Sequence, residues 1–202
     1  RNFVVTFSRA IMVIRADGSR PVTLRVKDLA ASEALADADI SPDGRTIAFT
    51  TVSGRAGTAE IDAATHTLST QRWWAHTMPA GRHTYDSYVP ATGNLIVAGT
   101  DGDARMLDGN LETIRSSYVG FAVDRLATSG DWVLASSGQG ISVYDARTLV
   151  VVDRIARTQI AASPADVRLD ASRQKLVALK FQATQDEEQT IKFDIPLPGL
   201  AR

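Results

Sequence analysis

The chain has 202 residues, of which 44% are hydrophobic and 22% are charged, as in an ordinary soluble globular protein. Its formal net charge of -1 and its lack of basic runs exclude the electrostatic footprint of a nucleic-acid-binding protein. Without cysteine it cannot form disulfides, zinc–cysteine sites or a thiol nucleophile, and no apolar run reaches the roughly 20 residues that span a bilayer. We therefore expect no nucleic-acid partner and no membrane insertion.

The chain begins at Arg1, without Met, and enters a strand-like stretch at residues 3–7. This start indicates a trimmed N-terminus, so we expect the sequence to belong to a longer protein. Its richness in Ala, Arg and Thr favours a bacterial source. The compartment is left open between the cytoplasm, the periplasm and the extracellular space.

In chain order, the sequence divides into units of short alternating strands joined by tight turns. Helical periodicity is almost absent, and the best helical candidate is a short stretch at residues 27–35. The first and last units have three predicted strands, and the other three have four. The units span residues 2–26, 35–73, 83–118, 123–155 and 165–195.

A strand–turn–strand element recurs from unit to unit. Its clearest copy, residues 40–49, reverses at Pro42-Asp43-Gly44. Proline presets φ and glycine accepts a positive φ, so this tight reversal is well encoded. Related elements lie at residues 88–97, 126–134 and 169–177.

An aspartate ends a later strand of most units and leads into a turn. Asp62, Asp108, Asp145 and Asp194 are separated by 46, 37 and 49 residues, close to the blade repeats of about 40–50 residues in propellers. A short carboxylate can accept hydrogen bonds from the backbone N–H groups of the turn that follows it. We therefore expect a structural role for these residues.

Two of these segments resemble known repeats. Residues 41–45 (Ser-Pro-Asp-Gly-Arg) before an apolar strand, and residues 143–145 (Val-Tyr-Asp), resemble the blades of WD40-like, TolB-like and YVTN-type propellers. The Gly-His and Trp-Asp pairs of true WD40 repeats are missing, which favours the TolB/YVTN-like group. The resemblance implies an all-β fold, a β-propeller of four-stranded antiparallel blades with about 4–5 blades visible. It implies no particular activity, since propellers host many functions.

The predicted strands are about two short of the number in five four-stranded blades. The absent strands would be the inner strand of the first unit and the outer strand of the last. Three arrangements remain open. Residues 1–202 are a fragment of a larger propeller, which we favour, or a single small closed propeller domain, or one of two chains that complete each other through unpaired strand edges.

The segment 72–86, between the second and third units, is unusual in composition. It holds two of the three Trp and two of the three His of the chain, and Trp, Tyr and Arg dominate binding hot spots. In a propeller, the loops that join consecutive blades share one face, where partners often bind. Adjacent Trp residues on a strand point to opposite faces, so at least one should pack between blades. The candidate binding residues are Trp73, Trp74, His76, Arg82, His83, Tyr85 and Asp86.

No metal or other cofactor is expected. His76 and His83 are separated by more than the usual short ligand spacings, and no third ligand is apparent. We interpret residues 101–103 (Asp-Gly-Asp) as a hairpin turn rather than a calcium loop, and residues 186–188 as a solvated loop tip. The sequence contains no known catalytic motif, so no catalytic residue is assigned.

These observations favour a non-catalytic propeller scaffold that binds a protein partner or a ligand through the loops of one face. The alternative is a propeller enzyme or enzyme subunit with a site in its central channel, as in lactonases and quinoprotein amine dehydrogenases. A third hypothesis is a structural subunit that associates with another chain through unpaired strand edges. The charged residues on predicted inner strands that the enzyme hypothesis would use are His83, Asp86, Asp124, Arg125, Asp166 and Arg168.

Overall fold

The structure is a computed structural model that describes residues 2–15, 18–62, 65, 67–76, 78, 84–89, 92–156, 166–170, 175–183 and 188–196. For residues 2, 3 and 84–87, and from residue 166 onward, it describes the backbone alone. Every regular element in this part of the chain is a β-strand, and no helix there is long and apolar enough to cross a membrane.

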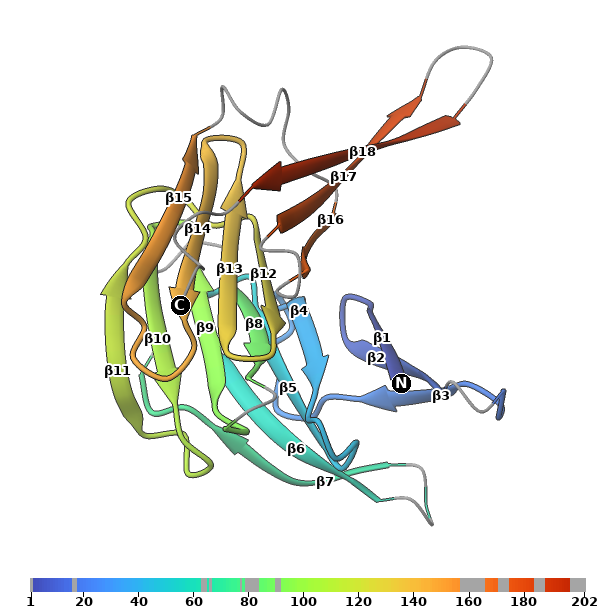
Figure 1. The fold of residues 1–202 in the computed structure, drawn as a ribbon. Coiled ribbons are helices and arrows are strands. Elements are labelled where there is room, and N and C mark those ends of the chain that lie inside the picture. Colours follow the sequence, from blue (N-terminus) through green and yellow to red (C-terminus); the bar gives the residue numbers. More distant parts are fainter. Residues whose placement is uncertain are drawn as a thin grey trace.

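The described residues form five antiparallel sheets (Figure 1), which confirms the predicted all-β fold of propeller-like blades. The first sheet contains β1 (Asn2–Thr6), β2 (Ala10–Arg15) and β3 (Val22–Arg25). The second contains β4 (Leu35–Ile40), β5 (Thr46–Thr51), β6 (Ala56–Asp62) and β7 (Thr67–Trp73). The third contains β8 (Thr84–Tyr88), β9 (Leu95–Gly99), β10 (Asp103–Leu107) and β11 (Thr113–Tyr118). The fourth contains β12 (Arg125–Ser129), β13 (Trp132–Ser137), β14 (Gly140–Asp145) and β15 (Val151–Ala156), and the fifth contains β16 (Asp166–Asp170), β17 (Lys175–Ala183) and β18 (Glu188–Pro196).

The sheets follow one another as blades, and within each complete blade the strands are paired in chain order. The innermost strands β4, β8, β12 and β16 pack side by side in the same order. Figure 1 shows the blades fanned out, with the first sheet (blue) and the last sheet (red) on the same side of the molecule. Each blade can therefore bury an apolar face against the next.

The first sheet starts with the second strand of a blade. The turn after β1 contacts the segment that enters β4, because the Leu35 N–H donates to the Ser8 carbonyl at 2.9 Å. In the second blade, the loop between β5 and β6 contacts the next linker in the same way, through the Met78 N–H and the Gly54 carbonyl at 2.8 Å. Within the described residues, the first sheet thus lacks the inner strand and the last sheet the outer strand, as the sequence predicts.

The turn between β4 and β5 shows how the sequence fixes a reversal. The Ser41 hydroxyl donates to Asp43 Oδ1 at 2.6 Å, and the Arg45 N–H donates to the same oxygen at 3.0 Å. Gly44 adopts a φ of 73°, as the turn requires. The hydrogen bond from Ser41, followed by that from the Arg45 amide, lowers the pKa of the Asp43 carboxyl. Asp43 therefore stays an ionised acceptor that holds the turn closed.

The aspartates that lead into the later turns have the predicted structural role. Each described carboxylate accepts hydrogen bonds from backbone N–H groups two to four residues ahead, which satisfies amides that the turn leaves free. The side chain of Asp194 lies outside the described residues. The pairs are Asp62 with Thr65, Asp108 with Asn110 and Glu112, and Asp145 with Arg147 and Thr148.

The apolar core lies between neighbouring blades and not inside a single barrel. Strand β5 shows why, because Ile47 and Phe49 pack with Ile11 of the first sheet, whereas Ala48 between them packs with Leu95 of the third sheet. Successive side chains of a strand point to opposite faces, so one buried strand contributes to two cores. A further cluster joins the third and fourth blades.

The helix candidate at residues 27–35 is wrong. Asp28 has a φ of 58°, outside the helical range. The Arg9 guanidinium also donates to the carbonyls of Leu29 and Ala30, each at 2.8 Å. The Glu33 N–H donates to the Ala30 carbonyl at 3.0 Å, so the segment forms a single turn that Arg9 holds in place, and not a helix.

Candidate binding surface

The loops that join consecutive blades lie on one face with the loops between the second and third strands of each blade. We call this surface the linker face. Backbone hydrogen bonds between the two kinds of loop hold it together. Its described segments are residues 26–34, 74–76, 78 and 119–124 from the linkers, and 7–9, 52–55, 100–102 and 138–139 from the loops within blades.

A buried carboxylate fixes the first linker. Glu33 is only 7% exposed. Its Oε2 lies 2.7 Å from Arg55 Nη1, and its Oε1 accepts a 2.5 Å hydrogen bond from the Ser53 hydroxyl. Burial raises the pKa of Glu33, but hydrogen bonds from Ser53 and Thr51 and the charge of Arg55 outweigh it, so the pKa is lowered. Ionised Glu33 thus ties the linker to the loop between β5 and β6.

An aromatic ring supports the cation of this pair. The guanidinium carbon of Arg55 lies 3.6 Å from the centre of the Trp73 ring, at cation–π distance. Trp73 in turn meets Phe49 edge to face, with ring centres 5.1 Å apart. We call Glu33, Ser53, Arg55 and Trp73 the Glu33 cluster. It joins the core between the first two blades to the linker face.

Trp74, the second Trp of the predicted binding segment, points to the opposite side from Trp73. Trp74 is 7% exposed and packs with Met78 and Tyr88 in the core between the second and third blades. The prediction that at least one of the two Trp residues packs between blades is confirmed. His76 is exposed and meets the Trp74 ring edge to face at 5.6 Å. Packing thus holds the Trp74 ring, while His76 lies at the surface.

The remaining predicted binding residues are not among those whose side chains the structure describes. Tyr85 and Asp86 are part of β8, with the backbone alone described. Arg82 and His83 lie outside the described residues. The structure therefore brings Trp73, Trp74 and His76 into one region, and recognition by this segment stays a prediction.

The third linker is fixed by backbone contacts. The Val119 N–H donates to the Gly102 carbonyl at 2.7 Å, and the Val123 N–H donates to the Gly99 carbonyl at 3.3 Å. Gly102 has a φ of 86°, and a Cβ there would lie 2.9 Å from the carbonyl oxygen of Phe121. The close approach of the linker therefore requires glycine at this turn.

The turn at Gly102 confirms one prediction from the sequence and lies beside a residue that the sequence analysis overlooked. The Gly102 N–H donates to the Gly99 carbonyl at 3.0 Å, and Asp101 Oδ1 accepts the Asp103 N–H at 3.1 Å. Residues 101–103 are therefore a hairpin turn, as predicted. Tyr118, at the end of β11, is 63% exposed beside this turn. Sequence reasoning missed this aromatic residue because it stands alone, outside any unusual segment.

The inner strands use their polar groups to join blades. Asp39 Oδ2 on β4 accepts the Tyr88 N–H of β8 at 2.8 Å, and the Thr128 hydroxyl of β12 donates to the Tyr88 carbonyl at 2.5 Å. Among the charged residues of the enzyme hypothesis, Asp124 is exposed and accepts the Gly138 N–H at 3.2 Å, and Arg125 is exposed. Side-chain positions of His83, Asp86, Asp166 and Arg168 are not described. The described residues include no group of three or more His, Asp or Glu that could bind a metal ion.

A groove of about 370 Å³ lies on the opposite face, between the second and third blades. Its floor is apolar, with Leu95 and Leu111 buried. Its charged lining residues are Asp43, Asp108 and Arg72. Since both carboxylates accept turn hydrogen bonds, their first role is to close the turns.

No protein-family model matches the chain, and no curated protein does. The fold, in contrast, matches 1222 chains of solved structures, so it is widespread and indicates an architecture rather than an activity. One of them is the crystal structure of a protein of unknown function from Bacteroides caccae, with a TM-score of 0.69 and 14% sequence identity. The match covers 96% of this chain and 74% of that one. At this identity the likeness supports the fold alone.

Proposed function

We propose that the chain is a non-catalytic propeller scaffold that binds a protein partner through its linker face. The observation that supports this most directly is the way the face is held. Charged and backbone hydrogen bonds fix the first, second and third linkers onto the neighbouring blade. Loops fixed in advance lose little conformational entropy on binding, which favours recognition of a partner by a preformed surface.

Exposed side chains on this fixed frame supply the contacts. Tyr118 is 63% exposed, His76 is exposed at the second linker, and Arg55 remains 31% exposed above Trp73. Tyrosine and arginine are enriched among residues that dominate binding energy. We assign direct contact with the partner to Tyr118, His76 and Arg55, and a packing role to Trp74.

We also place the blades in the TolB-like and YVTN-type group of propellers. The turn at residues 41–45 supports this placement through its Ser-Pro-Asp-Gly-Arg sequence and its hydrogen-bonded geometry. The scaffold function does not depend on it, because propellers of many groups bind proteins.

A photo-crosslinking comparison tests the scaffold function. The crosslinking amino acid p-benzoylphenylalanine replaces either Tyr118 on the linker face or Val150 on the opposite face, whose exposures of 63% and 60% are nearly equal. In cells of the source organism, we expect discrete protein adducts from position 118 and not from position 150. We expect the double change Tyr118→Ala and His76→Ala to weaken capture of that protein about tenfold or more.

Two results would oppose the scaffold function. Equal adducts from positions 118 and 150 would show that the linker face is not the binding surface. A stoichiometric cation or small molecule retained by the native protein, without protein adducts, would favour the channel-enzyme alternative.

A further inference from the structure

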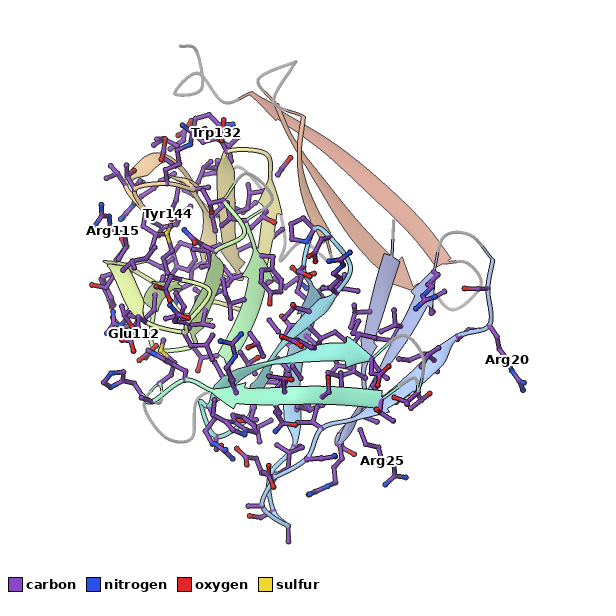
Figure 2. The ribbon with its side chains drawn as sticks, turned by 90° about the horizontal axis from the view of Figure 1, so that it is seen from below. Arg20, Arg25, Glu112, Arg115, Trp132 and Tyr144 are labelled. Carbon is purple, nitrogen blue, oxygen red and sulfur yellow. The ribbon has the colours of Figure 1, made fainter. Side chains whose placement is uncertain are left out.

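The outer edge of the first blade carries a basic surface that lines two adjoining hollows. A hollow of about 920 Å³ separates β3 from β7, and an adjoining one of about 400 Å³ shares Thr23 with it. Figure 2 shows Arg20 and Arg25 on this side of the molecule, away from Arg115 and Glu112. The two hollows are lined by the basic residues Arg9, Arg15, Arg20, Arg25 and Lys27 and by the acidic residue Asp28.

These basic residues differ in how far they are already engaged. The Arg9 guanidinium donates to carbonyls of the first linker, so it is a structural residue. Arg20, Arg25 and Lys27 are exposed, and none of them forms an ion pair within the described part of the chain. Their charges are therefore accessible to an anionic partner.

The edge of β3 also exposes its backbone. Strand β3 is the terminal strand of its sheet, paired on one side to β2 in an antiparallel register that matches Leu24 with Ile11. The Val26 N–H donates towards β2, to the Arg9 carbonyl at 3.4 Å. Because backbone groups alternate in direction along a strand, those of Arg25 and Lys27 point away from β2.

One residue of this edge is already paired in the manner of a strand. The Lys27 N–H donates to the Gln71 side-chain carbonyl at 3.0 Å, and the Gln71 amide nitrogen donates to the Lys27 carbonyl at 2.7 Å. A side-chain amide thus makes the paired hydrogen bonds that an added peptide would make. Next to this pair, the 920 Å³ hollow lies between the outward edge of β3, at Thr23 and Arg25, and residues Thr67 and Leu68 of β7.

We propose that an acidic segment of a protein partner binds in extended form along the outer edge of β3 and adds a strand to the first sheet. Its backbone would pair with Thr23 and Arg25, and its carboxylates would bind Arg20, Arg25 and Lys27. The exposed backbone edge favours a polypeptide over other polyanions, because alternating N–H and carbonyl groups complement only another peptide chain. The proposal does not rest on the linker face.

The test uses the full chain and a defined probe. The probe is a fluorescein-labelled peptide of about eight residues with alternating Glu and Val, the length of an ordinary strand. Fluorescence anisotropy should show binding that weakens as salt rises, since the pairs are exposed. A peptide with Gln in place of Glu should bind about tenfold more weakly or not at all. A Glu–Val peptide N-methylated at alternate residues should also lose binding, because it cannot pair with a strand edge.

A matched pair of variants locates the site. The double change Arg25→Gln and Lys27→Gln should weaken binding about tenfold, whereas Arg115→Gln with Arg147→Gln, which removes the same charge elsewhere, should leave it unchanged. Tyr118→Ala should also leave it unchanged, which separates this proposal from the linker-face function. Far-ultraviolet circular dichroism verifies that every variant is folded.

Three results would overturn the proposal. Equal binding of the N-methylated peptide would show charge attraction without strand addition. An equal loss in the Arg115 and Arg147 variant would show that net charge alone governs binding. Tighter binding of a heparin oligosaccharide or of phosphatidylserine vesicles than of the acidic peptide would assign the surface to another class of anion.

Discussion

At all three described linkers a backbone N–H binds a loop of the preceding blade, but the first linker also forms a buried ion pair with the blade that follows it. At the first, buried Glu33 binds Arg55 and Ser53, and Trp73 supports the arginine. At the second and third, backbone N–H groups of the linkers bind the carbonyls of Gly54 and Gly102. The backbone contact is thus repeated from blade to blade, and the first linker adds a charged cluster to it. The second and third contacts depend on glycine, because a Cβ at Gly54 or Gly102 would meet the linker.

The largest effect is expected at the second linker. Gly54 has a φ of 86°, and a Cβ there would lie 2.5 Å from the Met78 carbonyl oxygen, so Gly54→Ala must displace the linker. We expect a loss of about 3–4 kcal/mol in the free energy of unfolding, measured by urea titration. Gly93→Ala is the matched control, because Gly93 has a φ of 72° but no atom within 4 Å of its added Cβ. Its cost should be about 1 kcal/mol, and equal losses would refute the close-approach argument.

A smaller loss is expected at the first linker. Glu33→Ala removes the acceptor of the ion pair and leaves Arg55 and Ser53 without it. We expect the free energy of unfolding to fall by about 2 kcal/mol, because the partly exposed Arg55 regains some hydration. The control Asp131→Ala breaks the pair with Arg147, whose side chains are 54% and 67% exposed, and should cost no more than about 0.5 kcal/mol.

Lowering the pH removes the charge of Glu33 without changing the size of its side chain. The folded-state pKa of Glu33 is lowered from 4.5, so the unfolded chain takes up its proton first as the pH falls. The stability from ionised Glu33 is present above pH 4.5 and is lost as the pH falls through the folded-state pKa. The difference in unfolding free energy between wild type and Glu33→Gln should shrink over this range. A constant difference would contradict the charged cluster.

The local turns could be predicted from the sequence, whereas the contacts between blades could not. Pro42-Asp43-Gly44 and the aspartates at 62, 108 and 145 act within a few residues, so their spacing predicts their hydrogen bonds. Glu33 and Arg55 are far apart in the chain and meet only when two blades pack. Glu33 also lies in the segment mistaken for a helix, since its neighbours are good helix formers and the Arg9 contacts have no sequence signal.

The candidate binding residues also include some that the sequence identifies and some that it does not. Composition identified the aromatic segment at Trp73, and the alternation rule predicted opposite directions for the two Trp side chains, one in each core. Composition could not identify Tyr118, because it becomes a candidate only through its exposure at the end of β11, beside the turn at Gly102. The edge of β3 was also missed, because its basic residues are spread along the sequence and gather only beside one strand.

Native-state hydrogen exchange tests most directly whether the linker face is preformed. The amides of Leu35, Met78 and Val119 donate to carbonyls of other loops, so we expect them to be protected about as strongly as amides paired between strands. The Asn110 amide, bound only within an exposed turn, should exchange much faster. Exchange of these three amides at the rate of Asn110 would mean that the linker face is not fixed in advance, and the basis of the proposed scaffold function would be lost.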